Sequence, residues 1–117
     1  MNLTWKTKDN ILIVHMDGDI DHHSCEALRT EIDAALERMR CKHILFCFDH
    51  VAFMDSSGIG VLIGRYKLVQ RFGGRIAVCC AGERIREIFR LSALDQLFPS
   101  FARGDEAVFY LEGSGKK

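Results

Sequence analysis

Several features that would place a protein in a special class are missing from this sequence. No apolar stretch approaches the roughly 20 residues that a helix needs to cross a bilayer, and residues 1–10 have no apolar core of a secretory signal. Sixteen basic and sixteen acidic residues give a formal net charge of zero, so the basic excess that draws a protein to nucleic acid is absent. We therefore expect a cytoplasmic protein that has neither a membrane nor a nucleic acid as a direct partner.

The number and spacing of the cysteines argue against a disulfide-stabilised secreted protein and against a zinc-binding protein. The five cysteines are odd in number, form no Cys-x-x-Cys pair and match no zinc-site spacing. Cys47, Cys79 and Cys80 lie within apolar, strand-like runs, so we expect small buried thiols in a reducing compartment. The sequence predicts no metal and no cofactor.

What the sequence does have is the composition and pattern of a folded domain. Of its 117 residues, 48% are hydrophobic and 27% are charged, which is typical of a globular protein. Residues 44–48 are apolar at every position, which indicates a strand buried on both faces near the centre of a sheet. Apolar residues at spacings of three and four indicate the helices. The predicted strands span residues 3–7, 11–16, 44–48, 76–80 and 97–101. The predicted helices run from the cap Asp21 to residue 39, from the cap Asp55 to about residue 72, from residue 83 to 91 and from residue 105 to 111.

Because strands alternate with helices, we expect a layered α/β domain with a largely parallel sheet. The domain covers residues 1–117, of which 112–117 form a frayed tail. A turn at Asp9-Asn10 joins the first two strands into a hairpin. Pro99, the single proline, suggests that the last strand lies at a sheet edge.

Two polar clusters follow predicted strands. Residues 21–23 (Asp-His-His) come after the second strand, and residues 55–58 (Asp-Ser-Ser-Gly) come after the third. The carboxyl ends of parallel strands gather at one side of a sheet, so we expect the two clusters to be neighbours. Adjacent histidines do not share a helix face. His22 and His23 therefore fit the rim of a binding surface, or simple exposure to solvent, better than a metal pair.

Ser56 and Ser57 stand at the start of the second helix, next to backbone N–H groups without helical partners. A phosphoryl group adds roughly −1.5 to −2 charges, and a helix start can accept it without unfolding. Modification at this point would change what the surface binds and leave the fold intact. The alternative is that both serines only cap the helix, as serine commonly does.

The glycines that follow form no known nucleotide or catalytic motif. Gly58, Gly60 and Gly64 lack the Gly-Lys-Ser/Thr ending of a phosphate-binding loop, and no G-x-S-x-G surrounds Ser56. A glycine within a helix costs roughly 1 kcal/mol relative to alanine. These glycines either allow close packing on the sheet or leave one helix face open to a partner. The histidines are interpreted as sheet or surface residues, and a serine hydrolase is not expected.

At these residues the sequence resembles a known family. Residues 18–23 (GDIDHH) and 53–67 (FMDSSGIGVLIGRYK) are similar to segments of the anti-sigma factor antagonists, and most similar to the sporulation sigma-F type. The likeness extends over nearly the whole chain in length and in the order of its elements. It implies a single STAS domain, with a four- to five-stranded mixed β-sheet and helices packed on one side.

The resemblance also implies a protein-binding switch and not an enzyme. In this family the unphosphorylated antagonist binds an anti-sigma factor that is also a serine kinase (SpoIIAB type), and the sigma factor is released. The kinase phosphorylates the first serine of Asp-Ser-Ser-Gly, which ends binding, and a metal-dependent serine phosphatase (SpoIIE type) restores it. In this sequence that serine is Ser56.

A set of residues is expected at the partner surface, from the resemblance and from the strand-end argument. These residues are Asp21, His22, His23, Asp55, Ser56, Ser57, Gly58, Gly60 and Gly64. Two other functions stay open: a STAS antagonist or scaffold in a stress-response sigma pathway, and a nucleotide-binding domain that uses the glycine-rich helix start. The second is disfavoured because a phosphate-loop lysine is missing.

Overall fold

The computed structural model describes residues 1–113, and residues 114–117 of the predicted tail lie outside this part. The elements are β1 (Asn2–Lys8), β2 (Ile11–Asp17), α1 (His22–Met39), β3 (His43–His50), α2 (Ser56–Gln70), β4 (Ile76–Cys79), α3 (Glu83–Leu91), the 3₁₀ turn η1 (Leu94–Gln96), β5 (Ser100–Phe101) and α4 (Gly104–Leu111). Every predicted helix and strand is present, with some shifted ends. Among the described residues, no helix combines the length and the apolar character that a membrane span requires.

The strands form one sheet in the order β1-β2-β3-β4-β5. β1 runs antiparallel to β2 through the predicted turn at Asp9-Asn10, where Asp9 has a left-handed φ of 56°. The other neighbouring strands are parallel. β3 is the central strand and is buried from His43 to Phe48, as its apolar run predicts. The expected mixed α/β sheet is therefore confirmed.

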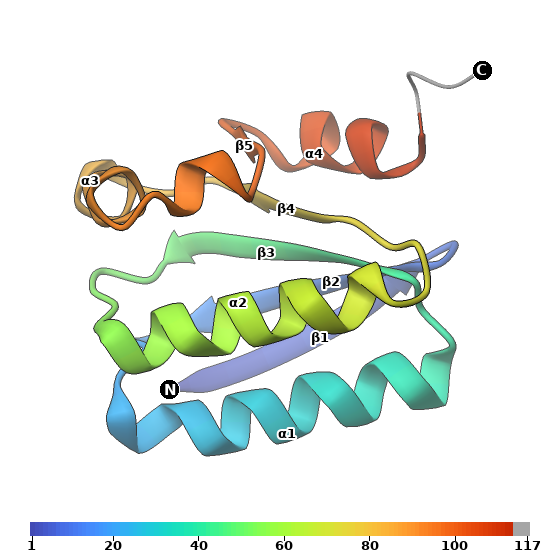
Figure 1. Ribbon diagram of the computed structural model, residues 1–117, viewed down its shortest axis with the longest axis horizontal. Helices are drawn as coiled ribbons and strands as arrows, with labels where there is room; N and C mark the ends of the chain where they lie inside the picture. Colours follow the sequence, from blue (N-terminus) through green and yellow to red (C-terminus); the bar gives the residue numbers. More distant parts are fainter. Residues whose placement is uncertain (114–117) are drawn as a thin grey trace.

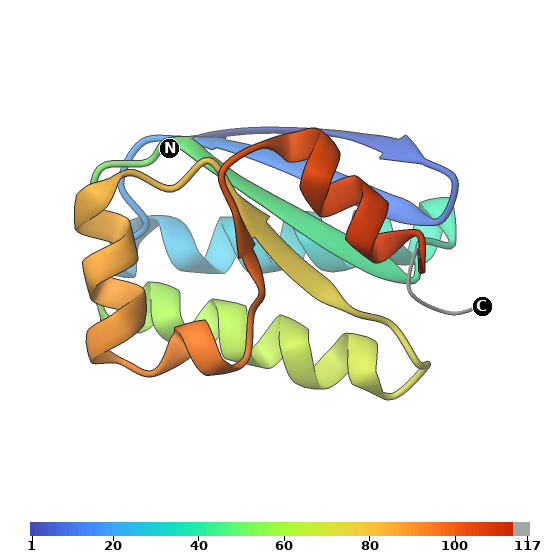
Figure 2. The ribbon, with the colours of Figure 1, turned by 90° about the horizontal axis from the view of Figure 1, so that it is seen from above.

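Both faces of the sheet are covered, by different helices (Figures 1 and 2). Side chains alternate along each strand, so Phe46 and Phe48 of β3 enter the larger core with α1, α2 and α3. Leu45 points to the other face, where it packs with Ala107 and Leu111 of α4. The expectation of helices on one side holds for α1, α2 and α3, whereas α4 covers the opposite face.

Two element ends differ from the prediction for local reasons. α2 ends at Gln70 and not near residue 72, and Gly73 then takes a left-handed φ of 76° that turns the chain toward β4. The last strand is shorter than predicted, because Phe98 turns into the core and Pro99 has no N–H to donate to a neighbouring strand. β5 lies at the edge of the sheet, as Pro99 suggested.

Candidate functional site

The two polar clusters lie side by side at the carboxyl ends of β2 and β3. An isolated parallel bridge joins Ile20 to Met54. The Ile20 N–H donates to the Phe53 carbonyl at 3.0 Å, and the Asp55 N–H donates to the Ile20 carbonyl at 3.1 Å. These bonds hold the loop before α1 against the loop before α2, and both helices begin at the same end of the molecule (Figure 1). The predicted proximity of the two clusters is confirmed.

Asp55 is the N-cap of α2, as predicted. Its Oδ1 accepts hydrogen bonds from the Ser57 N–H at 2.9 Å and from the Gly58 N–H at 3.3 Å. These are two of the backbone donors that a helix start leaves without a helical partner. Ser56 is therefore the first helical residue, and its side chain lies at the positive end of the helix dipole.

Asp21 caps α1 in the same way, with help from a serine. Its Oδ1 accepts from the N–H groups of His23 at 3.0 Å and Ser24 at 3.2 Å, and the Ser24 hydroxyl accepts from the Asp21 N–H at 3.0 Å. Burial raises the pKa of the Asp21 carboxyl, but these hydrogen bonds outweigh burial and bring the pKa below its ordinary value. Asp21 is therefore a carboxylate at neutral pH.

The hydroxyls of Ser56 and Ser57 take no part in capping. Within residues 1–113 no hydrogen bond engages either hydroxyl, in contrast to that of Ser24. Ser56 is exposed, and Ser57 is partly buried. The alternative that both serines only cap the helix is therefore wrong. Asp55 supplies the cap, and Ser56 presents its hydroxyl to solvent.

The three glycines of α2 have two different explanations. Gly58 is buried, and a Cβ placed there would lie 2.5 Å from Met54 Cγ and 2.7 Å from Ile20 Cγ2. The start of α2 thus lies so close to the Ile20–Met54 bridge that the hydrogen atom of a glycine fits at position 58, whereas the methyl group of an alanine does not. A Cβ at Gly60 or Gly64 would meet nothing within 4 Å. Close packing explains Gly58, whereas Gly60 and Gly64 leave an open strip on α2.

Two histidines and one arginine lie around these residues. His22 and His23 are exposed, and their rings meet edge to face with centroids 5.9 Å apart. In the described part of the chain, no three metal-binding side chains are grouped to hold an ion. Arg84 is not among the residues predicted for the site, and its guanidinium carbon lies 5.3 Å from the centre of the Phe53 ring. Arg84 is the second residue of α3, which follows the carboxyl end of β4, so its place at this edge of the sheet could have been predicted from the order of strands and helices.

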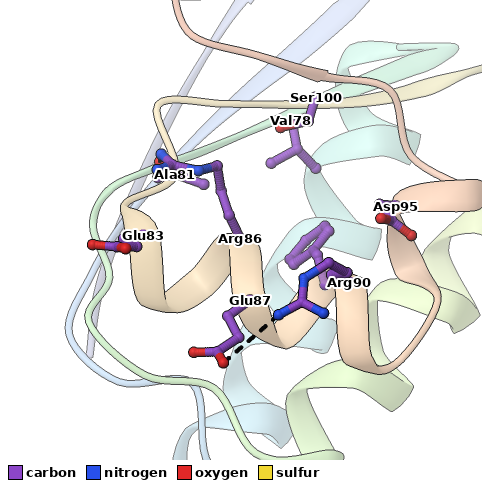
Figure 3. A pocket seen from close by; sticks show the side chains of 9 residues that line it. Val78, Ala81, Glu83, Arg86, Glu87, Arg90, Asp95 and Ser100 are labelled. Atoms are coloured by element: carbon purple, nitrogen blue, oxygen red, sulfur yellow. Dashed lines mark hydrogen bonds and ion pairs between the residues drawn. The ribbon is translucent and has the colours of Figure 1, made fainter.

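A cavity of about 510 Å³ lies beside α3 and is lined by none of the predicted site residues (Figure 3). On its wall Arg90 pairs with Glu87 at 3.7 Å, and the Arg86 guanidinium donates to the Ala81 carbonyl at 2.8 Å. The carboxylates on the wall outnumber these two arginines. This charge balance disfavours the phosphates of a nucleotide, because like charges repel.

Comparison with known proteins finds relatives along most of the chain. A profile of the STAS domain matches residues 2–107. An anti-sigma F factor antagonist of Paenibacillus polymyxa is 37% identical over 102 residues, which cover 87% of each chain. An anti-sigma-B factor antagonist of Bacillus subtilis is 29% identical over 108 residues, which cover 92% of this chain and 97% of the relative.

Solved structures with the same fold include the anti-sigma factor antagonist SpoIIAA. Its unphosphorylated form matches with a TM-score of 0.73 at 25% identity, over 96% of this chain and 99% of that one. The phosphorylated form of Bacillus SpoIIAA matches with a TM-score of 0.72 at 26% identity, over 92% and 96% of the two chains. The fold found here is therefore one that SpoIIAA has in both phosphorylation states.

Proposed function

This chain belongs to the STAS domain family, and we propose that it is an anti-sigma factor antagonist whose binding is switched by phosphorylation of Ser56. The antagonist function is supported by the two antagonists that the chain resembles along most of their length and by the fold of SpoIIAA. The observation that carries the switch is the exposed Ser56 hydroxyl, at a helix start that Asp55 already caps.

In this proposal the unphosphorylated chain binds an anti-sigma factor that is also a serine kinase, and the sigma factor is released. The kinase transfers the γ-phosphoryl group of ATP to the Ser56 oxygen, which loses its proton, and ADP leaves. A serine phosphatase hydrolyses the phosphoester and restores binding. The chain is the substrate of these two enzymes and is not itself an enzyme.

Charge explains why this modification would end binding and spare the fold. A phosphoryl group at the first residue of α2 brings roughly −1.5 to −2 charges to the positive end of the helix dipole, where anions are stabilised. In a partner interface the same charge would face the nucleotide phosphates of the kinase and the neighbouring carboxylates. Like charges placed together in an interface cost several kcal/mol, and about 1.4 kcal/mol weakens binding tenfold.

The choice of sigma factor rests on sequence identity. The anti-sigma F relative is 37% identical and the anti-sigma-B relative is 29% identical, which favours a sporulation circuit controlled by sigma F. A stress-response circuit of the sigma-B kind is the second candidate. Affinities for the anti-sigma kinases of both circuits, measured side by side, distinguish the two, since the chain should bind its own kinase more tightly.

Intact-protein mass spectrometry after incubation with ATP and a sporulation-type anti-sigma kinase tests the switch. We expect one added phosphate on the wild type and on the matched control Ser57→Ala, and none on Ser56→Ala. Ser56→Ala should still bind the kinase, and Ser56→Asp should bind at least about tenfold more weakly. The switch would be refuted if a kinase that modifies its own antagonist added no mass here, or if Ser56→Asp bound as tightly as the wild type.

A further inference from the structure

Three thiols on the α4 face of the sheet form a row. The Cys80 S–H donates to the Cys79 sulfur at 3.2 Å, and the Cys79 S–H donates to the Cys47 sulfur at 3.6 Å. Cys47 and Cys79 are register partners on β3 and β4, and Cys80 follows β4 with a left-handed φ of 66°. All three are free thiols, and the proposed function uses none of them.

The three thiols differ in their access to solvent. Cys47 and Cys79 are buried, with 4% and 0% of each residue exposed, whereas Cys80 is partly exposed. A dissolved oxidant therefore meets Cys80 first. Cys79 lies between the other two sulfurs and contacts both, so it can form a bond with either one.

Backbone geometry decides which pair can hold a stable disulfide. Neighbouring strands lie about 4.7–4.9 Å apart, which places the register partners Cys47 and Cys79 within the Cα separation of ordinary disulfides, about 4.4–6.8 Å. The Cα atoms of the consecutive residues Cys79 and Cys80 are about 3.8 Å apart, which is below that range. A vicinal disulfide is therefore strained and easily exchanged, and a bond between Cys47 and Cys79 is the stable product.

We propose that this row of thiols is an oxidation site at which hydrogen peroxide produces a disulfide between Cys47 and Cys79. Peroxide first oxidises the Cys80 thiol to a sulfenic acid and releases one water. The Cys79 thiol attacks the sulfenic sulfur, which forms the vicinal disulfide and releases a second water. Cys47 then attacks the Cys79 sulfur, and Cys80 leaves as a thiol with the proton from Cys47. In total two thiols lose two electrons, and one peroxide is reduced to two waters.

The environment of Cys80 sets the rate of the first step. Burial raises the pKa of Cys80 to about 12, and the thiolate is the form that reacts. The reaction is therefore slow at neutral pH. Its rate should rise about tenfold for each pH unit between about pH 7 and pH 9, because the thiolate fraction rises by that factor.

Tryptic digestion locates the bond in the full chain after peroxide treatment. Cleavage after lysine and arginine places Cys47 in peptide 43–65, and Cys79 together with Cys80 in peptide 76–84. After the free thiols are blocked, the unreduced digest should contain peptide 43–65 linked to peptide 76–84. A vicinal disulfide would instead stay within peptide 76–84, at a mass lower by two hydrogen atoms.

Single variants test the order of the steps. Cys80→Ser should slow the cross-link about tenfold or more, and Cys47→Ala should stop the reaction at the vicinal disulfide. Cys25→Ala removes a buried thiol outside the row, and this matched control should react like the wild type. The proposal would be overturned if Cys80→Ser formed the cross-link at the wild-type rate, or if the peroxide-treated wild type gave no peptide 43–65 linked to peptide 76–84.

Discussion

Alanine substitution at Gly58 should destabilise the fold. The new methyl carbon would lie 2.5 Å from Met54 Cγ, 2.7 Å from Ile20 Cγ2 and 3.1 Å from the Ile20 carbonyl oxygen. Ile20 and Met54 are buried and are bridged through their backbones, so neither can move away freely. Overpacking of this kind costs about 1–3 kcal/mol, and the loss of glycine flexibility returns about 0.5–1 kcal/mol. The midpoints of these two ranges give an expected net decrease of about 1 kcal/mol in the free energy of unfolding.

Alanine substitution at Gly60 or Gly64 should instead stabilise the fold. Their methyl groups would meet nothing within 4 Å, so the backbone effect alone remains. Each variant should gain about 0.5–1 kcal/mol in the free energy of unfolding. All three variants make the same chemical change in one helix, so a difference in sign between them must come from the surroundings of each glycine.

Urea unfolding followed by far-ultraviolet circular dichroism measures these free energies from the midpoint and the slope. For a chain of this length, 1 kcal/mol corresponds to a shift of about 3–5 °C in the thermal midpoint. A Gly58→Ala variant as stable as the wild type would refute the packing argument, because the start of α2 would then move away from Ile20 at little cost. Equal losses for Gly58→Ala and Gly60→Ala would refute it as well.

Three other changes test the cap, a buried histidine and an ion pair. Asp55→Ala removes both cap hydrogen bonds and should lower the free energy of unfolding by about 1 kcal/mol, whereas Ser57→Ala should change it by less than about 0.5 kcal/mol in the same urea experiment. Burial, helped by neighbouring positive charges, lowers the pKa of His43 below its ordinary 6.5. As the pH falls below about 6.5, His43 therefore takes up a proton more readily in the unfolded chain than in the folded chain. The free energy of unfolding should decrease from about pH 7.5 to pH 5.5, and this decrease should be smaller in His43→Gln. Arg65 Nε lies 2.9 Å from Asp33 Oδ1. Arg65→Met breaks this ion pair and should lower the free energy of unfolding by about 1–3 kcal/mol. In a double-mutant cycle, adding Asp33→Asn to Arg65→Met should restore part of that loss.

Local signals in the sequence were sufficient to predict most elements and both helix caps. Asp21 and Asp55 each stand directly before a predicted helix, and a cap depends on amide groups two or three residues away. The central position of β3 followed from residues 44–48, which are apolar at every position. The same run also required a cover on both faces of the sheet, so the sequence already contained the reason for α4 on the second face.

The approximate proximity of the two strand-end loops was predictable, but individual side-chain contacts between distant segments were not. Gly58 and Gly60 look equivalent in the sequence, yet a methyl group at Gly58 alone would meet Ile20, which comes from the loop after another strand. Cys47 and Cys79 became neighbours through the register of β3 on β4, and an apolar run without alternation does not fix a register. Both features depend on the register between neighbouring strands and on how their loops meet, and a single sequence carries little information about that register.

The start of α2 keeps the contacts that hold the fold apart from the hydroxyl proposed for modification. Asp55 supplies the cap, Gly58 packs against the bridge between Ile20 and Met54, and within residues 1–113 the Ser56 side chain contributes no hydrogen bond to either arrangement. A negative charge on Ser56 would therefore replace no native hydrogen bond, and it would lie at the end of the helix where anions are favourable. Loss of partner binding on phosphorylation then needs no unfolding of the domain, because charge in the interface is a sufficient cause.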